Sequence, residues 1–451
     1  MFPPLSTKKA HLYCTQVIKK IEDGSIQLLD IAKPSEERPA GQGVMIGVLV
    51  CREAVLLCLS GRRYWLAGDL SGFEYLEPII SEQELEKALK KNDKAIHELT
   101  EQIAICAEPD KKASLKKKRT ELTDESLKNV FSLYTFYDFS GNKITLNQII
   151  EKHGGVLPQT GTGDCCAPNL FSYAFKNHYH VQSLCEVYFG RDTETRKNGH
   201  EYPPCDERCR YILPYILGLE ILYRDDDFAV INKQPGLLSV PGRGEDKQDC
   251  AESRFKQLFS ACDVCCELEQ PAVHRLDMET SGILILAFNK ETHSYFNKEF
   301  REGRVSKKYI ALLDGVLEKS DGLSSPKHGE QSGLIEIKAR LDVDNRPHQI
   351  YDEENGKLGV TKWTKLCGQT YTNSDNKTKH VTRVLFEPET GRTHQLRIAS
   401  AFKQGFNLPI IGDSLYGTKT PGQRLYLHAS EITFIHPKSA RKITFFCTPD
   451  F

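Results

Sequence analysis

The sequence lacks the apolar segments that would direct a chain into or across a membrane. Its longest apolar stretch, residues 44–59, is interrupted by Arg52 and Glu53, so it fits two strands of a hairpin better than a membrane span. The N-terminal MFPPLSTKKAH has no apolar core of the kind that a signal peptide carries. We therefore expect a cytoplasmic protein, and 451 residues allow two or three domains with substantial cores.

Fingerprints of cofactor binding are also absent. The segment GTGDCC, residues 161–166, has the glycines of a tight backbone turn, but no Gly-Lys-Ser or Gly-Lys-Thr follows it, so it is not a phosphate loop. No Ser or Cys lies in a pattern that pairs a nucleophile with a base. The sequence therefore predicts no cofactor.

The fifteen cysteines do not form an obvious disulfide or metal framework. Their number is odd and no secretory signal precedes them, which favours reduced thiols. Cys165 and Cys166, with the Cys205-x-x-x-Cys209 pair, could form a zinc site. Structural zinc sites usually carry a CxxC or HxxxH pair on each side, however, so we favour buried thiols and predict no metal. The zinc alternative stays open.

Charge is distributed unevenly along the chain, although the net charge is only −1. Residues 361–451 hold 13 Lys and Arg against 6 Asp and Glu, whereas residues 216–360 hold 19 against 26. The basic C-terminal quarter could face a polyanion such as RNA. An ordinary solvated surface would explain it equally well.

Three segments are expected before the main domain. Residues 1–80 are β-rich, and residues 81–130 form an antiparallel helical hairpin that opens on a capping box, in which Ser81 and Glu84 cap each other. The first helix carries apolar residues at heptad spacing. Residues 131–215 are expected to be a cysteine-containing irregular or connecting region. The hairpin's second arm includes KKASLKKKRT, residues 111–120, which is either a solvated face or a grip on a nucleic-acid backbone.

Residues 216–451 contain many short strand-like runs with helices between them. This order predicts an α+β domain with a large mixed or antiparallel sheet. Within it, Asp277 precedes the apolar run at 283–287, which has the length and branching of a buried strand. A carboxylate at the edge of a core needs a partner, and Arg397 offers the fixed fork of a guanidinium. Together with Tyr309, these residues suit chemistry at a sugar or a base. A buried salt bridge packed by a tyrosine is the structural alternative.

Several motifs of this domain, in the same order along the chain, resemble those of RluA-type pseudouridine synthases. HRLDMETSG at 274–282 is similar to the HRLDxxTSG signature of that family. Further resemblance is carried by NKQPGLLSVPG at 232–242, GRTHQLR at 391–397, PIIGDSLYG at 409–417, LHA at 427–429 and HP at 436–437. It extends over about residues 216–451 and not over the first 200.

The resemblance implies the pseudouridine synthase fold and isomerisation of uridine to pseudouridine in ribosomal or transfer RNA, without a cofactor or a required metal. It implies that Asp277 is the catalytic aspartate, that Tyr309 stacks on the uracil, and that Arg397 pairs with Asp277. Arg275 would fill the space left by the flipped-out base. Further candidates for RNA contacts are Arg392, His394, Lys308 and Lys233. We interpret His274 and His394 as hydrogen-bonding residues of their motifs rather than as catalytic bases.

Two alternatives remain open on the sequence alone. A non-catalytic RNA-binding or RNA-folding protein could keep the same fold, although such a protein would not need Asp277, Tyr309 and Arg397 together. A glycoside hydrolase with Asp277 as nucleophile would require a second carboxyl group as general acid. Glu279 is the nearest candidate, and it is a weak one.

Overall fold

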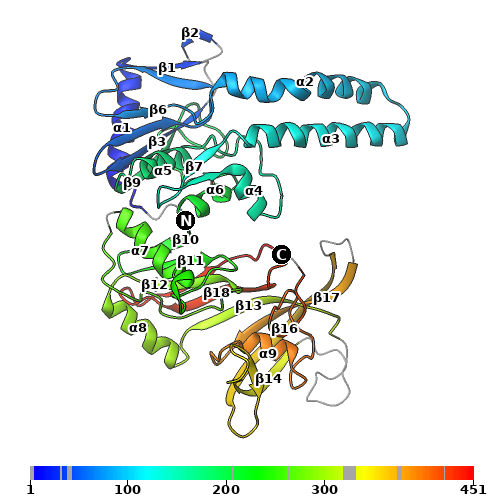
Figure 1. The fold of residues 1–451 in the computed structure, drawn as a ribbon. Coiled ribbons are helices and arrows are strands. Elements are labelled where there is room, and N and C mark those ends of the chain that lie inside the picture. Colours follow the sequence, from blue (N-terminus) through cyan, green and yellow to red (C-terminus); the bar gives the residue numbers. More distant parts are fainter. Residues whose placement is uncertain are drawn as a thin grey trace. The chain divides into compact units, whose positions relative to one another are not determined.

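The computed structural model describes residues 5–30, 33–37, 43–205, 207–262, 264–317, 332–372, 378–420 and 422–451 (Figure 1). The chain forms two compact units. An N-terminal unit comprises Met1–Ile221 with Lys256–Cys265, and a C-terminal unit comprises Leu222–Phe255 with Cys266–Phe451. No helix of the described ranges is long and apolar enough to cross a bilayer.

The N-terminal unit begins with a helix that the sequence analysis did not anticipate, followed by strands. Its α1 buries Ala10, Cys14 and Val17 at helical spacing in one core with β3. The expected hairpin at 44–59 is confirmed, since β3 and β4 pair antiparallel. The elements are α1 (Lys8–Glu22), β1 (Ile26–Asp30), β2 (Lys33–Glu37), β3 (Val44–Cys51), β4 (Val55–Leu59), β5 (Tyr64–Gly68) and β6 (Glu74–Leu76).

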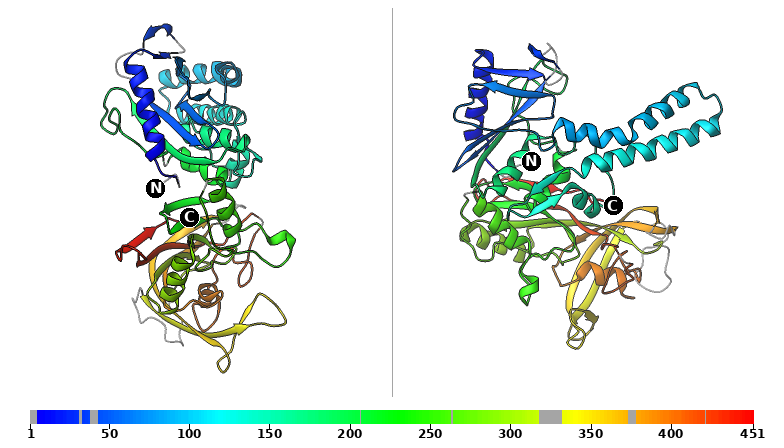
Figure 2. Two further views of the ribbon diagram at one scale, coloured as in Figure 1. Left: turned by 90° about the vertical axis from the view of Figure 1, so that its left-hand side faces the viewer. Right: turned by 45° about the horizontal axis from the view of Figure 1, so that its top comes forward.

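The helical hairpin consists of α2 (Glu82–Ile105) and α3 (Pro109–Phe131), which run side by side away from the strands of their unit (Figures 1 and 2). The expected capping box at Ser81 and Glu84 is present. Among the heptad positions, Asn92, Leu99 and Ile103 are buried. The arms therefore pack through one narrow seam, and their remaining faces are solvated.

Residues 131–215 are not the irregular connection that the sequence suggested. They form β7 (Thr135–Tyr137), β8 (Lys143–Thr145), α4 (Leu146–Lys152), α5 (Cys166–Lys176), β9 (Val181–Phe189) and α6 (Cys209–Ile216). Strand β9 pairs with β3 and completes a four-stranded sheet in the order β6-β4-β3-β9. Helix α5 is buried over most of its length, so its sequence has no polar face and hence no helical period to detect.

The C-terminal unit is built on a ten-stranded sheet in the order β10-β11-β12-β18-β13-β17-β16-β14-β15, with β19 paired to β18. Strands β12 and β18 are parallel while their neighbours are antiparallel, which confirms the mixed sheet of an α+β fold. The strands are β10 (Glu220–Arg224), β11 (Phe228–Lys233), β12 (Ser281–Ala287), β13 (Ser306–Leu313), β14 (Ser332–Leu341), β15 (Gln349–Tyr351), β16 (Lys357–Thr372), β17 (Thr378–Pro388), β18 (Leu427–Ile435) and β19 (Lys442–Phe446). The helices are η1 (Glu245–Lys247), α8 (Lys290–Arg301), α9 (Gln395–Ala401) and the beginning of α7 (Ala251–Ala261), which belongs to the N-terminal unit from Lys256 onward.

Strand β12 lies in the interior of this sheet, and all seven of its residues are buried. A strand covered on both faces reads as a continuous apolar run, as ILILA does. Gly282 has a φ of +111°, and a Cβ atom there would lie 2.3 Å from the carbonyl oxygen of Ala429 on β18. Glycine is thus required at position 282, where the loop of Asp277 enters the sheet.

Candidate active site

Asp277 lies in the loop before β12 and faces residues at the beginning of α9. Its Oδ2 lies 3.9 Å from Nη1 of Arg397, and its Oδ1 lies 4.0 Å from Nε2 of His394. The structure thereby brings the HRLD and GRTHQLR motifs together. The side chain of Asp277 remains 29% exposed, so one side of the carboxylate is open to a reacting group.

Arg397 has a closer partner than Asp277. Its Nε and Nη2 donate to the two carboxylate oxygens of Asp413 at 2.9 and 2.6 Å, and both side chains are almost completely buried. Asp413 also accepts the backbone N–H groups of Leu415 and Tyr416 at 2.9 and 3.0 Å. This bidentate pair fixes the guanidinium plane and aims the remaining nitrogen, Nη1, at Asp277.

His394 is positioned by Tyr416. Its Nδ1 lies 2.7 Å from Oη of Tyr416, and the same oxygen accepts the N–H of Gln349 at 2.8 Å. The other ring nitrogen, Nε2, faces Asp277. Burial lowers the pKa of His394, which favours the neutral ring at neutral pH.

Tyr309 is half-buried on β13, where it pairs with Phe386 on β17 and Ala429 on β18. Burial raises the pKa of its phenol, and the negative charge of Asp277 raises it further. The hydroxyl therefore keeps its proton at neutral pH.

Lys233 does not fit the expectation of an RNA contact. Its side chain is completely buried, and its ammonium group donates to the carbonyls of Gln234, Leu237 and Met278 at 3.0, 2.7 and 3.1 Å. Burial lowers its pKa to about 7. Lys233 instead joins the loop after β11 to Met278, the residue that follows Asp277. A single lysine before a turn gives no indication in the sequence that its side chain will be buried.

This clamp should contribute strongly to stability. We expect Lys233→Met to lower the free energy of unfolding of the C-terminal unit by about 2–4 kcal/mol, because carbonyl oxygens lose their donor without gaining water. Urea denaturation followed by tyrosine fluorescence would measure the change. Lys290→Met, at an exposed position of α8, serves as the control. Equal stability of the two variants would contradict the clamp.

The other cationic candidates lie at the surface. Arg275 and Arg392 are exposed, and Nε of Arg392 donates to the carbonyl of Leu358 at 3.0 Å. Lys308 forms an ion pair with Glu431 at 3.1 Å. These three side chains are accessible to a polyanion, whereas Lys233 is not.

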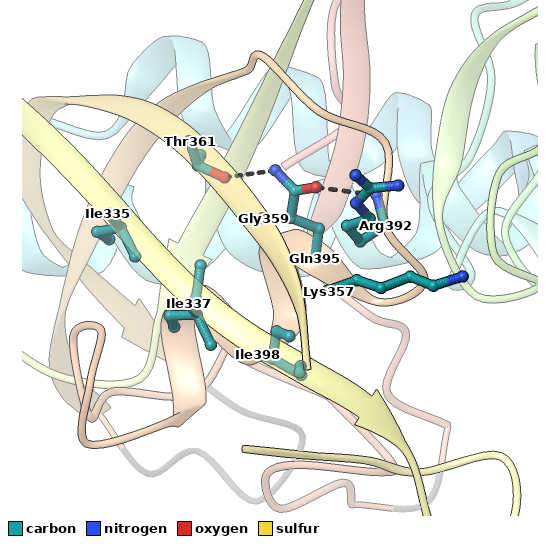
Figure 3. A pocket seen from close by; sticks show the side chains of 10 residues that line it. Ile335, Ile337, Lys357, Gly359, Thr361, Arg392, Gln395 and Ile398 are labelled. Atoms are coloured by element: carbon teal, nitrogen blue, oxygen red, sulfur yellow. Dashed lines mark hydrogen bonds between the residues drawn. The ribbon is translucent and has the colours of Figure 1, made fainter. Parts of the chain in front are cut away.

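A pocket beside α9 is distinct from the group around Asp277. Ile335, Ile337 and Ile398 give it apolar walls, and Gln395 closes one side with hydrogen bonds to the N–H of Arg392 and to Thr361, both at 2.9 Å (Figure 3). Neither Asp277 nor Tyr309 nor Arg397 lines it. We attribute this pocket to the packing of α9 on β14 and β16.

No role for Asp413 or Tyr416 follows from the sequence alone, although both belong to the PIIGDSLYG motif. Glu279 also lies at the site, where it accepts hydrogen bonds from Ser414 at 2.6 Å, Lys419 at 2.7 Å and Arg397 at 3.2 Å. The signal that could have found Asp413 is its charge: an acidic residue directly after three apolar or glycine positions requires a buried cation.

His274 has a structural place in the site. Its ring lies against Phe300, with 4.8 Å between ring centres, and its Nε2 accepts the N–H of Ile285 on β12 at 3.2 Å. Burial, aided by the charge of Lys307, lowers the pKa of His274 to about 3. The ring is therefore neutral in the folded protein over the whole physiological range, as expected for a structural histidine.

The lowered pKa predicts a sensitivity to acid. An unfolded histidine binds a proton near pH 6.5, and the folded ring does so only near pH 3. The stabilisation is therefore complete above about pH 6.5 and is lost as the pH falls, at up to about 1.4 kcal/mol per pH unit. Denaturant titrations between about pH 7 and pH 5 should show a weaker pH dependence for His274→Gln than for the wild type. Identical slopes would refute the assignment.

Comparison with known proteins supports the motif assignment. The family described as RNA pseudouridylate synthase matches residues 227–402. The dual-specificity RNA pseudouridine synthase RluA of Haemophilus ducreyi is 39% identical over 236 residues, which cover 52% of this chain and 94% of that protein. The RluA protein of Escherichia coli K12 is 34% identical over the same coverage. The solved structure of human RNA pseudouridylate synthase domain containing 1 is 28% identical, with a TM-score of 0.39, over 51% of this chain and 83% of that one. With its motifs and this similarity over nearly the full length of its relatives, the chain belongs to the RluA-type RNA pseudouridine synthase family.

Proposed function

We propose that this protein isomerises uridine to pseudouridine in ribosomal RNA, transfer RNA or both, with Asp277 as the catalytic aspartate. The observation that carries the proposal is the partly open carboxylate of Asp277, held between the guanidinium of Arg397 and the imidazole of His394. The reaction breaks the bond from C1′ of the ribose to N1 of uracil and forms one to C5, and overall a proton leaves C5 while another binds N1. Atoms and electrons balance without a cofactor.

Each neighbouring group has a task in this proposal. The carboxylate of Asp277 attacks C1′ or assists departure of the uracil. Arg397 positions that carboxylate, with its Nη1 3.9 Å from Oδ2. Tyr309, which keeps its phenolic proton, offers a stacking face for the detached ring and takes part in proton transfer at the base.

The target uridine must leave the stack before its glycosidic bond can be reached, which costs a few kcal/mol of unstacking. We infer that Arg275, exposed and two residues before Asp277, occupies the space that the flipped base vacates. The surface cations Arg392 and Lys308 would hold the flanking phosphates. Lys233 has no part in this contact, because it is buried.

The hydrolase alternative is weaker in view of Glu279. A glycosidase needs a carboxylic acid that holds a proton to protonate the leaving group. Although burial opposes the effect, hydrogen bonds from Lys419 and Ser414 lower the pKa of Glu279. It is an ion-paired carboxylate and a poor general acid. The non-catalytic RNA-binding alternative is separated from the proposal only by an assay of the product.

Pseudouridine mapping tests the proposal directly. Total RNA would be mapped from cells that lack this protein, and from the same cells supplied with the wild type or with Asp277→Ala. We expect the loss of one or a few pseudouridines that only the wild type restores, which would also name the RNA. Restoration by Asp277→Ala, or no altered site, would favour the RNA-binding alternative.

The N-terminal unit, we propose, grips the RNA through α3. Lys116, Lys117 and Lys118 are exposed on this arm, which carries a strongly basic surface. Phosphate contacts of this kind give affinity without sequence preference and weaken with salt, because bound counterions are released. We likewise propose that this part of the chain is divided into segments at about residues 80 and 130.

Neutralising the arm should change the salt dependence of RNA binding. Log affinity falls with log salt concentration, so the slope is negative. With Lys116, Lys117 and Lys118 replaced by Gln, it should become less steep by about 0.7–0.9 for each phosphate that the arm no longer binds. Filter binding of the substrate RNA at several salt concentrations measures the slope. The control replaces three exposed lysines of α1, Lys8, Lys9 and Lys19, in the same way. Equal slopes for the two variants would remove α3 from the RNA interface.

A cytoplasmic location is part of the same proposal. It is supported by fifteen cysteines, none of which forms a disulfide, as expected in a reducing compartment. Fractionation of cells that express the protein at its native level would test it, and recovery outside the cytoplasmic fraction would contradict it.

A further inference from the structure

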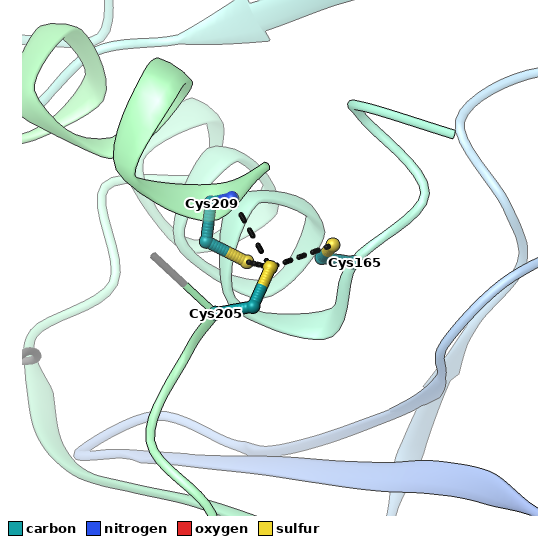
Figure 4. Close-up of side chains that lie close together, drawn as sticks. All are labelled: Cys165, Cys205 and Cys209. Atoms are coloured by element: carbon teal, nitrogen blue, oxygen red, sulfur yellow. Dashed lines mark hydrogen bonds between the residues drawn. The ribbon is translucent and has the colours of Figure 1, made fainter. Parts of the chain in front are cut away.

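Three cysteines from separate parts of the N-terminal unit converge on one point. Sγ of Cys205 lies 4.0 Å from Sγ of Cys165 and 3.7 Å from Sγ of Cys209, and all three sulfur atoms lie within 4.8 Å of one another (Figure 4). Cys166 is not a member, because its thiol points to the carbonyls of Met45 and Cys58. The spacing of these cysteines in the sequence argued against a zinc site. The folded chain nevertheless brings Cys165 next to the Cys205–Cys209 pair, so the sequence spacing no longer excludes a shared metal ion.

The distances match those of a metal-thiolate tetrahedron. A zinc–sulfur bond is about 2.3 Å long, and two ligands at tetrahedral angles are then about 3.8 Å apart. The two sulfur–sulfur distances to Cys205, 3.7 and 4.0 Å, lie on either side of this value. A disulfide requires about 2.05 Å, and it would pair only two of the three sulfurs.

The surroundings suit thiolates. The N–H of Cys209, at the first turn of α6, points to Sγ of Cys205 at 3.5 Å. Cys165 is the N-cap residue of α5, so two helix N-termini meet at the cluster. Backbone N–H groups and helix N-termini stabilise the charge of metal-bound sulfur.

We propose that the thiolates of Cys165, Cys205 and Cys209 bind a zinc ion. The site is independent of the group around Asp277. On binding, each of the three thiols releases its proton to solvent and forms one sulfur–zinc bond. Among the described residues no fourth His, Cys, Asp or Glu joins the cluster, so the fourth position is left to water or another ligand. The ion fastens the connection between β9 and α6 to the beginning of α5.

Metal content of the purified protein tests the proposal. The tag-free full chain, produced with zinc in the medium and desalted, should contain about one equivalent of zinc by mass spectrometry. Cys205→Ser should lose it, whereas Cys367→Ser, at an exposed position on β16, should retain it. Zinc held equally by both variants would overturn the assignment.

A second measurement does not depend on the folding of a variant. The wild type, freed of metal by a mercurial and then reduced, is titrated with Co²⁺ in the absence of oxygen. Three thiolates in a tetrahedral site should give an intense sulfur-to-cobalt absorption and visible bands that zinc abolishes. Absence of these bands, or a disulfide in the freshly purified protein with no zinc, would overturn the proposal in favour of a redox-active thiol pair.

Discussion

Asp277→Asn is expected to lower the rate of pseudouridine formation by about 10⁴-fold or more, the range seen when a nucleophile or its activating partner is removed from an active site. The amide is nearly isosteric with the carboxylate but carries no charge, and it can neither attack C1′ nor stabilise positive charge that develops there. Single-turnover assays with excess enzyme on a defined RNA substrate would measure the chemical step apart from product release.

The fold of this variant should be unaffected. Asp277 is partly exposed, and its two charged or polar neighbours lie at 3.9 and 4.0 Å, too far for strong hydrogen bonds. Its thermal transition should therefore match that of the wild type closely. Asp344→Asn, at an exposed turn, controls for the substitution itself. If Asp277→Asn kept a rate within tenfold of this control, Asp277 would not be the catalytic group.

Asp413→Asn should be among the most destabilising single changes in the C-terminal unit. It removes the charge that faces the guanidinium of Arg397, where both side chains are at most 3% exposed. Breaking one side of a buried pair costs about 3–5 kcal/mol, because the remaining charge is left without compensation. Urea unfolding would measure the loss. Glu389→Gln, which breaks the exposed pair with Lys362, should change the stability little.

A double variant separates stability from catalysis. Arg397→Met with Asp413→Leu removes both charges, and apolar residues of similar volume should recover much of the stability lost in Asp413→Asn. Activity should stay low, because nothing then orients the carboxylate of Asp277. Recovery of activity together with stability would show that Arg397 and Asp413 serve the fold alone.

Local patterns allowed part of this structure to be predicted. The capping box at Ser81, the hairpin of β3 and β4, and the buried strand at 283–287 all depend on neighbours within a few residues, and all three are present. The segment 131–215 was misjudged because β9 and α5 gain their stability from distant partners such as β3. The secondary-structure propensity and the hydrophobic periodicity of a segment carry no information on such distant partners.

For the candidate site too, some features could be predicted from the sequence and others could not. Motifs identified Asp277, Tyr309 and Arg397, and the structure brings Asp277 to the start of α9. Side-chain partners could not be derived in the same way. Arg397 was paired with Asp277, but its hydrogen bonds go to Asp413 and Glu279. The ammonium of Lys233 is directed inward rather than toward RNA. The direction in which a charged side chain points depends on which carbonyls and carboxylates the fold places nearby, and sequence spacing does not give this.

The ammonium group of Lys233 has a consequence for substrate binding. It joins the carbonyls of Gln234 and Leu237 to that of Met278, the residue after Asp277. The loop that carries Asp277 is thus anchored in the free protein, and the conformational entropy of that segment is lost when the chain folds and not when the complex forms. Binding free energy from the RNA is then available for extracting the target base from its stack, and the loop should lose its order only when the whole unit unfolds.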